Sequence, residues 1–174
     1  MFLSLYGHYL KAASYYNIRF IFLIHTYLEG SLVEENIQEK IYGVLKKYRN
    51  AKFLRNGRVL EEGIDCLGFI KLFYEDFGIY VPGDDGKPIE EEWYKKDPER
   101  YIRGIKSLGY KDVKIDELQA LDLAYFVISH DVITHAGIMI SDREFVHMSP
   151  KSGLLISRLE RHWRRRFRGA IRFF

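Results

Sequence analysis

Cysteine is almost absent from this chain of 174 residues, in which Cys66 is the only one. A single cysteine excludes an intrachain disulfide framework, and without a Cys-x-x-Cys pair the usual signature of a structural zinc site is missing. Long hydrophobic runs are absent too, because the most apolar run, Phe20 to Ile24, spans five residues. A membrane-crossing helix needs roughly 20. We therefore expect no transmembrane span and a fold that packing stabilises.

The N-terminus also lacks the marks of an export signal, because no basic segment precedes its apolar residues and no small-residue cleavage site is evident. Residues 4–28 are typical of an amphipathic or buried helix, with a peripheral membrane anchor left open. We expect residues 1–32 to form an N-terminal helical extension. Residues 33–174 then form one domain, since 47% hydrophobic residues suffice for a single core.

Charge is unevenly distributed, although the formal net charge is only +3. Seven arginines lie between Arg158 and Arg172. No recognised nucleic-acid motif accompanies them, so we expect a solvated face or attraction to an anionic polymer, and no nucleic acid as partner. Acidic residues crowd residues 84–99. We interpret 84–108 as an insertion or lid, helical with an interruption at Pro98.

Hydrophobic periodicity predicts helices first and strands afterwards. Apolar residues at helical spacing indicate a helix over about 33–49 and a central, strongly apolar helix from Cys66 to Gly78. From about Leu121 the pattern changes to short β-branched and aromatic runs. The expected strands are Leu123 to Ile128, His135 to Ile140, Glu144 to Met148, Leu154 to Ser157 and Ala170 to Phe174. This order predicts an α+β domain with an antiparallel sheet.

The chemistry-bearing residues are Cys66, His135 and His147. A thiol at a helix N-terminus faces free N–H groups and the positive end of the dipole, so we expect its pKa to be lowered. Pairing across a tight hairpin would bring the two histidines together, one as base and one to orient it. Gly137 lies on the His135 face, which predicts space there for a substrate.

Several segments together resemble the NlpC-type cell-wall cysteine peptidases, which are papain-like hydrolases. The likeness covers roughly residues 40–174. It is carried by Gly63 to Phe69 around the cysteine, Gly78 to Pro82, Leu121 to Phe126, His135 to Ile140, Phe145 to Ser149 and Trp163 to Arg172.

The resemblance implies a papain-like fold, with the cysteine helix packed on an antiparallel sheet, and no cofactor. It implies that Cys66 attacks an amide carbonyl, His135 shuttles the proton and His147 orients His135. The implied substrate is a peptidoglycan stem peptide or muropeptide, cut next to D-glutamate and a diamino acid. The family acts in the cell envelope or outside the cell, whereas the missing export signal leaves the cytoplasm open.

Two positions depart from the family pattern. Leu67 follows the nucleophile where most relatives have serine, and Phe53 stands nearest to the place of a tyrosine whose hydroxyl helps the oxyanion or substrate. Tyr48, Phe53 and Asp65 are therefore the candidates for substrate or oxyanion support, and Asp65 also suits a helix cap.

Other readings stay open. A related amidase, deamidase or acyltransferase could use the same three residues, since an acyl group passes to whichever nucleophile enters. A non-catalytic wall-binding or interaction module could keep the fold. A zinc site of thiolate and imidazole ligands is chemically reasonable, but nothing else in the sequence supports a metal. The sequence does not define the oligomeric state.

Overall fold

The computed structural model describes residues 36–81, 88–107 and 111–173. The predicted extension over 1–32 lies outside these ranges, as do residues 84–87 and 108 of the predicted insertion. The domain bounds therefore stay predictions. None of the helices in the described ranges combines the length and apolarity that a bilayer crossing requires.

The helical part of the domain is built around aromatic side chains. Residues 36–48 are helical, which agrees with the helix expected over 33–49. The central helix α3 (Cys66–Asp76) buries Phe69 and Phe73 completely. The Tyr48 ring, also fully buried, meets Phe69 edge to face at 5.4 Å between centroids. Rings in this arrangement add roughly 0.5–1.5 kcal/mol beyond their area burial, which helps fix α3 in the core.

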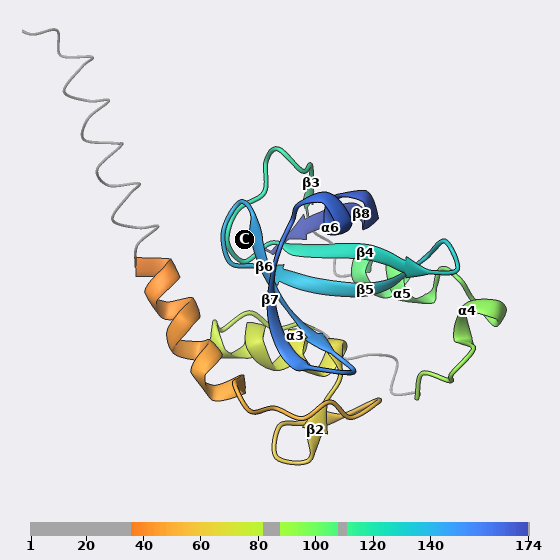
Figure 1. Cartoon of the computed structure of the whole chain (residues 1–174), viewed down its shortest axis with the longest axis horizontal. Coiled ribbons are helices and arrows are strands. Elements are labelled where there is room, and N and C mark those ends of the chain that lie inside the picture. The colour runs from red at the N-terminus through yellow and green to blue at the C-terminus, as the bar shows by residue number, and fades with distance from the viewer. Residues whose placement is uncertain (1–35, 82–87, 108–110, 174) are drawn as a thin grey trace, which may run out of the picture. The chain divides into compact units, whose positions relative to one another are not determined.

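A six-stranded antiparallel sheet forms the rest of the domain (Figure 1). Its strand order is β3-β8-β4-β5-β6-β7. The strands are β3 (Lys111–Val113), β4 (Leu123–Ser129), β5 (Val132–Met139), β6 (Glu144–Ser149), β7 (Gly153–Arg158) and β8 (Phe167–Arg172). Helix α3 packs against β5 and β6. The short strands β1 (Arg58–Val59) and β2 (Gly63–Ile64) pair with each other ahead of α3. The predicted α+β, papain-like arrangement is confirmed.

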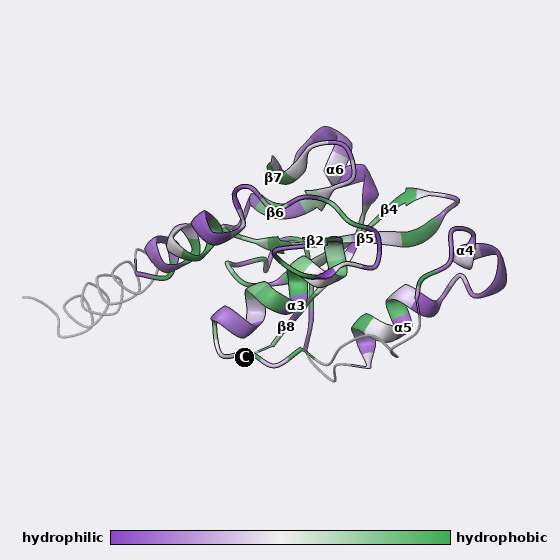
Figure 2. Ribbon diagram, turned by 90° about the horizontal axis from the view of Figure 1, so that it is seen from below, coloured by the Kyte–Doolittle hydropathy of each residue, from purple (hydrophilic) through white to green (hydrophobic). Residues whose placement is uncertain are grey.

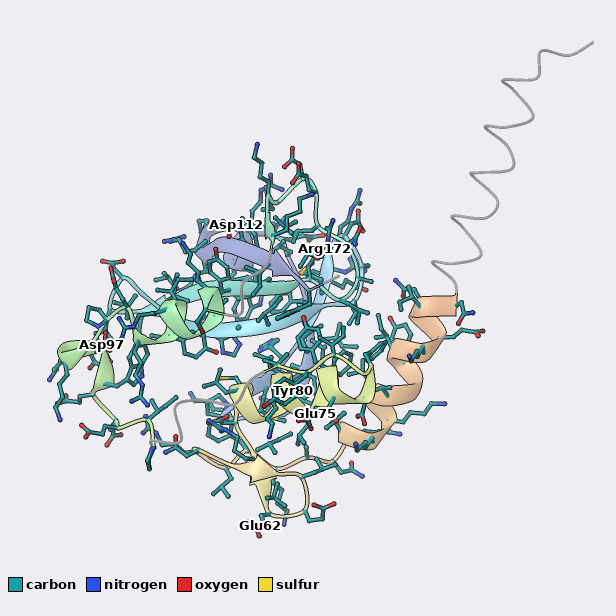
Figure 3. The ribbon with its side chains drawn as sticks, turned by 180° about the vertical axis from the view of Figure 1, so that it is seen from behind. Glu62, Glu75, Tyr80, Asp97, Asp112 and Arg172 are labelled. Atoms are coloured by element: carbon teal, nitrogen blue, oxygen red, sulfur yellow. The ribbon has the colours of Figure 1, made fainter. Side chains whose placement is uncertain are left out.

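The segment between α3 and the sheet contains α4 (Trp93–Lys96) and α5 (Arg100–Lys106), separated at Pro98 as predicted. Figure 3 labels Asp97 in the interruption. The segment is attached on two sides. The backbone N–H of Ile89 donates to Oδ1 of Asn56 at 2.9 Å, and the Tyr94 ring stacks on His130 at 3.9 Å. These contacts fix α4 and α5 against neighbouring parts of the domain.

The arginine-rich stretch forms α6 (Arg161–Arg166), which packs against β4. Its basic side chains colour it mostly hydrophilic in Figure 2, whereas much of α3 is hydrophobic. Trp163 is the exception on α6, because it packs on the cluster that contains Phe126 and Phe145. The predicted solvated face and an aromatic residue that packs on the core therefore belong to the same short helix.

Strand β8 is joined to the start of β4 by a buried ion pair. Arg172, labelled in Figure 3, donates from Nε and Nη2 to the two carboxylate oxygens of Asp122 at 2.7 and 2.8 Å. Asp122 also accepts from the backbone N–H of Gln119 at 2.8 Å. Asp122 is therefore a turn-bonding group as well as an ion-pair partner.

Candidate active site

Cys66 is the first residue of α3, directly after the helix cap. Asp65 accepts at Oδ1 from the Gly68 N–H at 2.9 Å, which satisfies one of the free donors of the first turn. The same carboxylate accepts from the Asn56 N–H at 3.0 Å and from Arg58 at 2.7 Å. These hydrogen bonds connect the first turn of α3 to the segment before it, so the Asp65 side chain holds the start of α3 in place.

Gly68 explains why the motif has a glycine two residues after the cysteine. A Cβ atom at Gly68 would lie 2.2 Å from the carbonyl oxygen of Gly57, which is far inside van der Waals contact. The loop that precedes α3 can therefore approach the helix only at glycine. This close approach positions Cys66 relative to the loop.

The thiol of Cys66 contacts a tyrosine that the sequence analysis did not single out. The hydroxyl of Tyr101, on α5, lies 3.5 Å from Sγ. Tyr101 is only 8% exposed, whereas Cys66 is partly exposed.

The thiol pKa moves opposite to the expected direction. Burial raises the pKa of Cys66 to about 11, and the Asp65 carboxylate adds to the rise. The hydrogen bonds from Tyr101 and from the Leu67 N–H lower the pKa but are outweighed. Desolvation of the thiolate therefore exceeds the helix N-terminus effect on which the sequence expectation relied.

The two histidines are brought together as predicted. Nε2 of His135 on β5 lies 3.0 Å from Nδ1 of His147 on β6. Strands β5 and β6 pair only at Ile138↔Val146 and Met139↔Phe145, so the ladder ends before the imidazoles. The predicted space beside Gly137 is absent, because a Cβ there would lie 2.6 Å from the Phe145 ring and 3.2 Å from Cβ of His147. Gly137 makes room for these side chains and not for a substrate.

A third polar group continues this chain of contacts. Nε2 of His147 lies 3.0 Å from Oγ of Ser157 on β7. Burial lowers the pKa of His147 to about 4, and burial followed by the nearby His147 lowers the pKa of His135 to about 3. Both imidazoles are therefore neutral at neutral pH. A neutral imidazole carries one N–H, so each ring can donate only one hydrogen bond in the series from His135 through His147 to Ser157.

Trp163 of α6 covers the histidine pair. Its ring stacks on His135 at 5.8 Å and meets His147 at 5.0 Å with an interplanar angle of 68°. This ring contributes to the burial that lowers the pKa values of both imidazoles. The arginine-rich helix thus contributes its aromatic residue to the candidate site.

The three residues predicted to support the substrate or the oxyanion lie in different parts of the domain. Tyr48 donates its hydroxyl to Asp76 at 2.5 Å, at the opposite end of α3 from Cys66. Phe53 forms a parallel bridge with Ile64 and brings no hydroxyl. Asp65 serves the helix cap described above.

Sequence reasoning missed three residues, Tyr101, Ser157 and Trp163. Only Ser157 had an accessible signal. The β6–β7 pairing places Leu155 opposite His147, and Ser157, two residues after Leu155, is the diagonal neighbour of His147.

Cys66 and His135 come from elements in contact, α3 and β5. Within the described ranges no hydrogen bond joins the thiol to an imidazole, and the side chain in hydrogen-bond contact with Sγ is Tyr101. The same ranges contain no group of three His, Cys, Asp or Glu side chains arranged to hold a metal ion. The geometry thus brings a phenol to the thiol on α3 and a serine to the histidine pair on the sheet.

Comparison with known proteins gives a consistent result. The model of the NlpC/P60 family matches residues 50–172. The chain is 28% identical over 139 residues to a murein DD-endopeptidase/murein LD-carboxypeptidase of Escherichia coli, covering 79% of this chain and 63% of that protein. It is 28% identical over 131 residues to a gamma-DL-glutamyl hydrolase of Bacillus subtilis, covering 74% of this chain and 27% of that one. The chain thus spans less than two thirds of each relative.

A solved structure supports the fold. A lipoprotein-like protein of the NLP/P60 family from Staphylococcus aureus superposes with a TM-score of 0.54 at 22% identity, covering 80% of this chain and 41% of that one.

Proposed function

Since this chain belongs to the NlpC/P60 family, we propose that it is a cysteine hydrolase that cleaves an amide bond in a peptidoglycan stem peptide, next to D-glutamate and a diamino acid. The observation that carries the proposal is the packing of α3, which begins with Cys66, against β5 and β6, which bear the contacting His135 and His147. The two relatives are named for hydrolysis of murein and of gamma-DL-glutamyl bonds, which supports this substrate class.

The proposed reaction proceeds through a thioester. Sγ of Cys66 attacks the amide carbonyl carbon while His135 takes the thiol proton, and the tetrahedral intermediate then expels the amine, which His135 protonates. Water next attacks the thioester, transfers a proton to His135, and releases the carboxylic acid and the free thiol. The Cys66 N–H, at the start of α3, is a donor for the oxyanion.

The protonation states favour one version of the first step. The pKa of Cys66 is raised to about 11 and that of His135 is lowered to about 3, so at neutral pH the two groups are a thiol and a neutral imidazole. A preformed thiolate–imidazolium pair is thus disfavoured in this state. His135 acts as a general base at the moment of attack.

The direct test uses muropeptides from digested bacterial sacculi, including cross-linked dimers, with products identified by chromatography and mass spectrometry. We expect stem-peptide cleavage by the wild type and none by Cys66→Ala. A new free amine on the diamino acid would locate the scissile bond. Binding without cleavage, together with no alkylation of Cys66 by iodoacetamide up to pH 10, would contradict the hydrolase proposal and favour a binding module.

A further inference from the structure

The Cys66 site contains a hydroxyl that comes from an unexpected part of the chain. Tyr101 belongs to α5, within the segment predicted as an insertion, and its hydroxyl is 3.5 Å from Sγ of Cys66. Phe53 has no hydroxyl, and the Tyr48 hydroxyl is bonded to Asp76. Tyr101 is therefore the phenol that meets the nucleophile.

We propose that Tyr101 is a catalytic residue of this site, whose hydroxyl donates a hydrogen bond to the Cys66 thiolate as it forms and then to the oxyanion of the tetrahedral intermediate. This inference rests on the proposed function for its second step only. The first step concerns the thiol alone. A carbonyl carbon bonded to Sγ carries its oxygen within a few ångströms of the sulfur, so a donor already at hydrogen-bond distance from Sγ can follow the charge.

The direction of the hydrogen bond follows from chemistry. A phenol hydroxyl is a better donor than a thiol, and burial together with the adjacent Cys66 raises the pKa of Tyr101, so the hydroxyl keeps its proton. A donor that stays protonated stabilises negative charge on sulfur. This agrees with the Tyr101 bond lowering the pKa of the thiol against the dominant effect of burial.

Tyr101 is held in place by its own segment. The Trp93 ring of α4 stacks on the Tyr101 ring at 6.2 Å with an interplanar angle of 28°. Trp93 is thus a positioning residue for the phenol. The Asn56–Ile89 and Tyr94–His130 contacts attach this segment to the loop before α3 and to the β4–β5 turn. A preorganised donor of this kind needs no reorganisation during the reaction.

Two substitutions at Tyr101 separate a chemical role from a packing role. Tyr101→Phe removes only the hydroxyl and leaves the ring stacked on Trp93. We expect iodoacetamide to alkylate Cys66 about 10-fold more slowly at pH 8, because a hydrogen bond to a charged group is worth about 1.4 kcal/mol or more. Tyr101→Ala also relieves burial, the largest cause of the raised thiol pKa, so alkylation should become faster than in the wild type. A residue that only packs would not give these opposite changes.

Tyr80→Phe is the matched control, because Tyr80 is 71% exposed and its hydroxyl should not affect the thiol. On muropeptides, Tyr101→Phe should lower kcat by about 10²-fold with little change in KM, as expected for a lost oxyanion donor. An alkylation profile of Tyr101→Phe identical to that of the wild type from pH 6 to pH 10 would overturn the inference. If the alkylation profile of Tyr101→Phe is shifted but the wild type cleaves no muropeptide, the thiol contact is supported and the proposed function is rejected.

Discussion

Nε2 of His135 and Nδ1 of His147 lie 3.0 Å apart, and only one of them can carry the shared proton. If His135 donates, its Nδ1 is a free acceptor for the thiol proton, and His147 in turn donates from Nε2 to Oγ of Ser157. If His147 donates instead, Nδ1 of His135 carries a proton and cannot act as a base. A serine hydroxyl can donate or accept, so the Ser157 contact fits both arrangements, and only the first leaves His135 able to act as a base.

The first prediction concerns this tautomer. His147→Ala removes the acceptor for His135 and should lower kcat on muropeptides by about 10²-fold or more, since the wrong tautomer of a base is inactive. Ser157→Ala should have a smaller effect in the same direction. KM should change little in both, because neither residue is proposed to contact the substrate. Wild-type kcat in His147→Ala would contradict the assigned role.

The second prediction concerns stability in acid. Both histidines have a folded pKa far below 6.5, so protons bind to the unfolded chain first as the pH falls. The stability that they contribute is complete above pH 6.5 and is lost as the pH falls towards 4 and 3. The free energy of unfolding should fall by at most about 1.4 kcal/mol per pH unit for each histidine.

Urea denaturation between pH 7 and pH 4 measures this slope. His147→Gln should flatten it relative to the wild type. His162→Gln, on the exposed face of α6, controls for the loss of an imidazole elsewhere in the domain. An equal slope in wild type and His147→Gln would show that His147 is not buried as a neutral ring.

The reach of sequence reasoning can be judged residue by residue. The order of motifs around Cys66, His135 and His147 located the helix that begins with Cys66 and the two histidine strands. Short β-branched and aromatic runs predicted five of the strands, β4 to β8, to within a few residues, but not β1, β2 or β3. Those signals are local. Tyr101 could not be found in the same way, because its contact with Cys66 joins residues 35 positions apart in the sequence.

Two expectations failed because they treated local effects in isolation. The thiol pKa was expected to fall at the start of α3, but burial of the thiol by the tertiary structure raises it and prevails. Gly137 was expected to leave space for a substrate. The hairpin register instead directs Phe145 and His147 at that glycine, and this register is set by the turn and not by the glycine itself.

The third prediction separates stability from reactivity at the helix cap. Asp65→Asn keeps one acceptor for the Gly68 N–H but removes the charge that faces Arg58. We expect a loss of about 1 kcal/mol in the free energy of unfolding, together with a lower thiol pKa, because the Asp65 charge is the second cause of its rise. Alkylation at pH 8 should therefore be faster in a less stable protein. Asp142→Asn, in an exposed ion pair with Arg143, should change neither quantity.

The last prediction concerns the ion pair that joins β8 to the start of β4. The Asp122 side chain is fully buried and that of Arg172 is 15% exposed, so removing one charge leaves the other poorly solvated. Asp122→Ala should cost about 3–5 kcal/mol in the free energy of unfolding. The exposed pair Arg158–Glu144 offers a matched control, and Glu144→Ala should cost less than about 1 kcal/mol. If both variants lost the same small amount, the buried pair would be no stronger than a surface one, and the packing of β8 on β4 would have to stabilise this end of the sheet by itself.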